Sequence, residues 1–139
     1  MKSAFGRIHR ILGLFISLGV LVQMFLAGIW HAHVVASPDA HIYFGLTLLL
    51  ASLLALLAAI FGGLGRRVVS LTGLLFLLIL LQPILIEQRR SGIPLISALH
   101  PLNAAFIGIV GGVVMRVSGA EQAEKEAAPA ADVAVSMGD

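Results

Sequence analysis

The chain has 139 residues, of which 59% are hydrophobic and 12% charged, with a mean hydropathy of +1.03. This composition excludes a soluble globular domain and predicts an integral membrane protein whose main partner is the lipid bilayer. The absence of cysteine excludes disulfides, thiolate metal sites, iron–sulfur clusters and covalent c-type haem attachment. The net charge of +2 is too small to indicate a nucleic-acid partner.

Four apolar segments follow one another along the chain. They cover residues 11–30, 42–64, 68–86 and 93–115, and none of them contains Asp, Glu, Lys or Arg. A helix needs about 20 residues to cross a hydrocarbon core of about 30 Å. The sequence therefore predicts an all-α, integral membrane four-helix bundle over residues 1–118, multi-pass in the inner (plasma) membrane of the cell.

Basic side chains are unevenly distributed between the two ends of these segments. One end carries Lys2, Arg7, Arg10, Arg66, Arg67 and Arg116, whereas the other carries Arg89 and Arg90. Positively charged loops remain on the cytoplasmic side of a membrane. This pattern predicts that both termini are cytoplasmic and that the loops after the first and third segments face outward.

The last part of the chain, residues 119–139, has a different composition. It is rich in alanine and acidic residues, contains a proline, and has no aromatic side chain. Such a segment has too little apolar surface to form a packed core. The sequence predicts a disordered, acidic, Ala-rich cytoplasmic tail.

A polar pattern recurs within the apolar region. His41 follows Gln23 by 18 residues, His100 follows Gln82 by the same interval, and the two pairs are separated by an offset of 59. At that offset Gly45 aligns with Ala104 and Arg7 with Arg66. The pattern predicts two pseudo-symmetric helix pairs, with one histidine from each pair directed at a shared centre. Few of the aligned positions are identical, so chance similarity remains the alternative.

The predicted orientation places four of the five histidines at the outer face. His41 begins the second segment, and His100 lies about one turn inside the fourth. His31 and His33 stand where the first segment emerges, and they suit either exposed interfacial residues or a small copper or zinc site. His31 is also a spare candidate for axial ligation of a haem iron. His9 lies in the inner basic run and is interpreted as an interfacial anchor.

Small and amide side chains accompany the two histidines. Gly45 and Ala104 lie one helical turn after them, where missing side-chain volume would admit the edge of a porphyrin. Small residues are also the ordinary packing surface between membrane helices. Gln23 and Gln82 are expected to hydrogen-bond between helices, or to orient an imidazole and meet a haem propionate or a quinone carbonyl.

The residues around these positions carry a resemblance to known proteins. The segment 18–45, with Val-Gln-Met-Phe-Leu-Ala-Gly and then a histidine opening the next helix, resembles uncharacterised small four-helix membrane proteins of bacteria and archaea. The Leu-Gln-Pro and Leu-His-Pro-Leu-Asn-Ala runs strengthen that likeness. Over residues 7–115 the chain also resembles one four-helix half of haem A synthase. That resemblance implies that His41 and His100 hold a b-type haem iron between them.

The chain also departs from the haem A synthase pattern. That family joins two such halves and has a glutamate just before the first histidine of its catalytic half, whereas Pro38, Asp39 and Ala40 precede His41 here. The sequence contains no Ser-His-Asp arrangement, phosphate loop or paired intramembrane carboxylate. A non-catalytic role is therefore expected.

Two functions remain open at the level of sequence. The first is a b-type haem protein that carries electrons, with a quinone as a further candidate cofactor. It would work with a redox partner at the outer face or as the haem-bearing subunit of a membrane complex. The second is a cofactor-free accessory subunit of a larger respiratory or photosynthetic membrane assembly.

Overall fold

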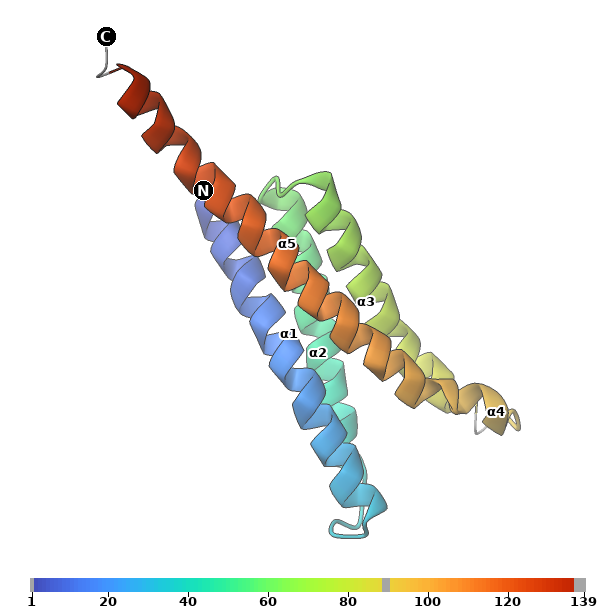
Figure 1. Cartoon of the computed structure of the whole chain (residues 1–139). Coiled ribbons are helices and arrows are strands. Elements are labelled where there is room, and N and C mark those ends of the chain that lie inside the picture. The colour runs from blue at the N-terminus through green and yellow to red at the C-terminus, as the bar shows by residue number, and fades with distance from the viewer. Residues whose placement is uncertain (1, 89–90, 137–139) are drawn as a thin grey trace.

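The computed structural model describes residues 2–88 and 91–136, and the side chains of residues 4–88 and 91–124. Every regular element in this part of the chain is a helix (Figure 1). The helices are α1 (Lys2–His31), α2 (Asp39–Phe61), α3 (Arg66–Glu87), α4 (Pro94–Ser97) and α5 (Leu99–Ser136). All except the one-turn α4 are long and apolar enough to cross a membrane, which confirms the predicted all-α bundle with four candidate spans.

The four long helices form two hairpins that pack side by side. The first hairpin is α1 with α2, and the second is α3 with α5. The hairpins touch where α2 meets α3 and where α1 meets α5, so that α2 and α5 stand on one diagonal of the bundle. Both termini and the α2–α3 turn lie at one end of the molecule, and the hairpins diverge toward the other end (Figure 1).

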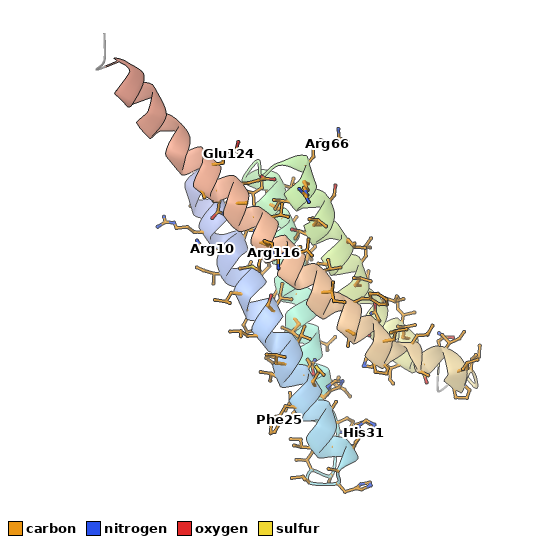
Figure 2. The ribbon with its side chains drawn as sticks, viewed as in Figure 1. Arg10, Phe25, His31, Arg66, Arg116 and Glu124 are labelled. Atoms are coloured by element: carbon orange, nitrogen blue, oxygen red, sulfur yellow. The ribbon has the colours of Figure 1, made fainter. Side chains whose placement is uncertain are left out.

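A narrow core lies between the hairpins, and outward-facing apolar side chains surround it. The core residues are Ile16, Ala51, Ala55, Leu75, Ile79, Ile107 and Val114. Many larger apolar side chains point outward, among them Phe25, which is 65% exposed (Figure 2). Such an apolar exterior would associate in water but is well solvated by acyl chains.

Charged side chains gather at the end that holds the termini. Figure 2 shows Arg10, Arg66 and Arg116 in this region, whereas His31 lies at the opposite end. All three arginines are exposed, and no salt bridge of theirs is present within the described residues. Arg89 and Arg90, which the sequence places at the other end, lie outside the described residues.

The segment after residue 118, for which the sequence predicts a disordered tail, is helical as far as the structure describes it. Helix α5 continues to Ser136, and residues 137–139 lie outside the described part of the chain. The Glu121 carboxylate accepts a hydrogen bond from the Gly65 amide at 3.1 Å, and the Gln122 amide donates to the Gly6 carbonyl at 3.2 Å. Alanine and glutamate favour helix, and extending an existing helix requires no new nucleus. The acidic run therefore begins as part of the bundle.

Candidate functional site

Two histidines meet between the hairpins at the end where these diverge. His41 lies in the first turn of α2 and His100 is the second residue of α5. Their ring centroids are 6.1 Å apart, with the ring planes inclined at 64°. Both side chains are half-buried. The sequence prediction that these two residues share one centre agrees with this geometry.

The two imidazoles are held by equivalent hydrogen bonds. The Nδ1 atom of His41 lies 3.2 Å from the Gln23 carbonyl oxygen, and Nδ1 of His100 lies 3.2 Å from the Gln82 carbonyl oxygen. A carbonyl oxygen only accepts, so Nδ1 carries the proton in both rings. Nε2 of each neutral ring is therefore a bare lone pair, and it has no hydrogen-bond partner within the described residues.

The two Nε2 atoms suit a metal ion whose other ligands come from a cofactor rather than from the protein. An imidazole nitrogen lies about 2 Å from a bound transition metal, so two rings on opposite sides of one ion would have centroids about 6 Å apart. The separation of His41 and His100 is compatible with that arrangement. A hydrogen bond from Nδ1 to a carbonyl is the usual way of orienting a metal-binding histidine. No group of three or more His, Cys, Asp or Glu side chains converges in the described part of the chain. An all-protein metal cage is thus not formed there, whereas an iron already held by a porphyrin needs only two axial ligands.

The two glutamine amides support the histidines in different ways. Nε2 of Gln23 donates to the His41 carbonyl at 3.0 Å, while its Oε1 is buried without a partner. Oε1 of Gln82 accepts a hydrogen bond from Asn103 at 3.1 Å, and the same Asn103 nitrogen donates to the Leu78 carbonyl at 2.7 Å. Each amide therefore ties together the two helices of its own hairpin. The sequence also places Asn103 within hydrogen-bonding reach of Gln82, three residues after His100.

Gly45 lies against the side chain of Gln23. A Cβ atom at this position would come within 2.6 Å of the Gln23 Nε2, so the amide occupies the space that the missing side chain leaves. Gly45 therefore admits the Gln23 side chain between α1 and α2. Its counterpart Ala104 is half-buried on α5.

The remaining outer histidines make no ring contact with this pair in the described part of the chain. His31 is exposed, donates through Nδ1 to the Ala27 carbonyl at 2.9 Å, and packs its ring against Trp30. His33 is exposed in the α1–α2 loop with a positive φ of 58°. Neither residue makes a ring contact with His41 or His100 within the described residues.

His9 is the polar residue that sequence reasoning misplaced. It is fully buried at the opposite end of the bundle, rather than exposed on its surface. Its Nε2 lies 3.0 Å from the Thr72 hydroxyl of α3, and its Nδ1 lies 3.3 Å from the Ser118 hydroxyl of α5. His9 precedes Gln23 by 14 residues, close to four helical turns of about 3.6 residues, which places both on one face of α1. That spacing was the sequence signal that could have predicted the burial of His9.

The chain matches no protein-family model, no curated protein and no solved structure. Its function is therefore argued from the geometry of its own residues.

Proposed function

We propose that this protein is a b-type haem protein of the membrane, in which His41 and His100 are the axial ligands of one haem iron. The observation that carries the proposal is the pair of bare Nε2 atoms on two rings whose centroids are 6.1 Å apart. The donors come from different hairpins, so the bound group would also hold the diverging ends of the hairpins together.

The proposed role is electron carriage rather than catalysis. When bound, a haem with two imidazole ligands exchanges single electrons between its ferric and ferrous states. The carbonyls of Gln23 and Gln82 hold the two rings in the tautomer that presents Nε2. Electrons would pass between a membrane quinol and a redox partner at the outer face, or between subunits of a membrane complex. The residues before His41, namely Pro38, Asp39 and Ala40, provide no glutamate for the oxidative chemistry of haem A synthase.

The proposal includes two pseudo-symmetric halves. The equal hydrogen bonds of His41 and His100 support it, as does the match in burial at the offset of 59. Ile16 and Leu75 form one such buried pair, and Ala55 and Val114 form another. Halves related in this way place equivalent residues around a common axis along the membrane normal.

We also propose that both termini are cytoplasmic and that the histidine pair lies near the outer face of the plasma membrane. The exposed arginines at the terminal end support this orientation. Cysteines introduced at Ser37 and Ser91 are expected to react with an impermeant maleimide added outside intact cells. A cysteine at Arg66 is expected to react only after the cells are opened, and the reverse labelling pattern would invert the orientation.

A reduced-minus-oxidised absorption spectrum of the purified protein in detergent tests the haem. We expect a b-type α-band in the wild-type protein and its loss in both His41→Ala and His100→Ala, since either change removes one of the two axial ligands. A wild-type protein that carries no haem after expression with excess haem precursor would refute the proposal.

The second candidate is a cofactor-free accessory subunit of a larger membrane assembly. The observation that favours it is the Gln23 amide, which fills the space beside Gly45 that a porphyrin edge was expected to use. The same spectrum separates the two functions. An accessory subunit shows no α-band and is isolated together with the subunits of its complex from native membranes.

A further inference from the structure

A cavity of about 320 Å³ adjoins His41 on the first hairpin. Leu26 and Ile29 of α1 form one side, and Val35 and Pro38 of the α1–α2 loop form another. Ser37 and His41 supply its polar side chains. A mostly apolar hollow with a few polar groups is typical of sites for small organic ligands, which measure about 300–1,000 Å³.

The cavity depends on a difference between the two hairpins. At the offset of 59, the loop segment 35–38 aligns with residues 94–97, which form helix α4 in the second hairpin. Helix α4 packs against both α3 and α5. The first hairpin has an open loop at the aligned position, so the hollow beside His41 is not covered by a helical turn.

The hydroxyl of Ser37 is available to a ligand. The Ser37 oxygen accepts a hydrogen bond from the backbone amide of Asp39 at 3.4 Å. The hydroxyl proton of Ser37 has no acceptor within the described residues. The hydroxyl can therefore donate a hydrogen bond to a ligand oxygen. His41 contributes only its ring surface, because Nδ1 is bonded to Gln23 and Nε2 is the proposed iron ligand.

We propose that this cavity binds the head group of a membrane quinone. A substituted quinone ring is flat and apolar, carries carbonyl oxygens that accept from a hydroxyl, and reaches the ends of the spans from within the bilayer. The volume accommodates one such ring. The inference rests on the proposed function in one respect: contact with His41 would make the bound quinol the electron donor to the haem.

The haem iron would be the oxidant of the bound hydroquinone. Conversion of one hydroquinone to the quinone releases two protons and two electrons. The electrons would leave singly through His41, so each hydroquinone would reduce the iron twice. The redox partner at the outer face would reoxidise the iron between the two reductions. The protons would leave to water at the α1–α2 loop, where Val35, Ala36 and Ser37 are all exposed.

Trp30 provides a readout that does not require haem. It is the only tryptophan of the chain and follows Ile29, which lines the cavity. We propose to titrate a short-chain benzoquinone into the haem-free full-length protein in detergent and to record tryptophan fluorescence. Saturable quenching is expected, because a quinone quenches an indole at short range.

Matched loop variants locate the quenching. Ala36→Phe places a large side chain on the cavity wall and is expected to weaken quinone binding by about tenfold or more. Ala32→Phe adds the same ring to an exposed position of the same loop that does not line the cavity, and is expected to bind as the wild type does. Ser37→Ala removes one hydrogen bond and is expected to weaken binding by roughly fivefold.

The outcomes separate this inference from the proposed haem. Quenching that does not saturate, or that is equal in wild type and Ala36→Phe, overturns the quinone site whatever the haem spectrum shows. Saturable, Ala36-dependent quenching in a protein that never takes up haem supports the quinone site and refutes electron transfer to iron.

Discussion

Each end of the bundle holds buried polar side chains, but the histidines at the two ends differ in burial and in the hydrogen bonding of their ring nitrogens. At the terminal end, both ring nitrogens of His9 are bonded to hydroxyls, and the side chain is fully buried. At the other end, His41 and His100 are half-buried, and each has one nitrogen bonded and one bare. About 20 Å separates the two levels, from the 14 residues between His9 and Gln23 at 1.5 Å each.

The tautomer of the imidazole also differs between the two ends of the bundle. The Thr72 hydroxyl donates its only proton to the Val68 carbonyl at 2.8 Å, so it must accept from Nε2 of His9. Nδ1 of His9 then accepts from Ser118. Both ring nitrogens are satisfied, as burial of a polar side chain requires. Saturation of the nitrogens, rather than burial alone, distinguishes a packing histidine from one that is available to a ligand.

The largest expected effect is a reciprocal loss in two variants. His100→Ala is expected to abolish the haem spectrum, since one of two axial ligands is gone. His9→Ala is expected to keep the spectrum but to lower the stability in detergent by about 3 kcal/mol, because it creates a cavity and removes the partner of two buried hydroxyls. Haem spectra and thermal unfolding of each purified variant measure both effects.

His33→Asn is the control for both variants. Asparagine tolerates the positive φ of 58° at this exposed loop position, so neither haem content nor stability should change. Loss of haem in His9→Ala with an unchanged unfolding temperature would contradict the contrast drawn between the two ends.

The two glutamines provide the next test. Gln82→Leu removes one of the two acceptors of the Asn103 amide and is expected to destabilise the bundle by about 2 kcal/mol. Gln23→Leu removes a hydrogen bond to the His41 carbonyl but also removes a buried oxygen that has no partner. The loss of stability in Gln23→Leu is expected to be about 1 kcal/mol smaller than in Gln82→Leu. Equal unfolding temperatures in detergent would show that the two hairpins are supported alike.

Gly45 sharpens the comparison between the hairpins. Gly45→Ala is expected to displace the Gln23 amide and to cost about 1–2 kcal/mol, since its Cβ would lie 2.6 Å from Nε2. In the Gln23→Ala background the same change is expected to be nearly neutral. A double-mutant cycle on the unfolding free energy measures this coupling, and strict additivity would mean that the amide is not what Gly45 accommodates.

The smallest effect is expected where α5 meets the α2–α3 turn. Glu121→Gln removes a negative charge at the N-terminus of α3 and is expected to cost about 0.5–1 kcal/mol. The loss should shrink in high salt, because the carboxylate is only partly buried. Glu124→Gln, an exposed position on the same helix, is the control. An equal effect of both changes would remove the specific role of Glu121.

The fold and the paired histidines were accessible from the sequence for local reasons. The number of candidate spans follows from runs of apolar residues long enough to cross a bilayer, and the structure has the same four helices. The recurrence of glutamine and histidine at one interval predicted that His41 and His100 meet. The helical period places His9 on the same face of α1 as Gln23. Applied to the charged first turns of α1, it would have predicted that His9 faces the interior of the bundle.

What only the tertiary structure decided is which polar atoms are satisfied. The partners of His9 lie 63 and 109 residues away in the sequence, on helices whose rotation about their own axes no local pattern sets. The same holds for the bond between Asn103 and Gln82 and for the unpartnered oxygen of Gln23. It also holds for the hollow beside His41, where the first hairpin has no counterpart of α4. Apolar runs determine that a helix crosses the membrane, because that depends on composition. The availability of a side chain to a ligand depends on what the neighbouring helices place against it, and this is determined only when the hairpins pack.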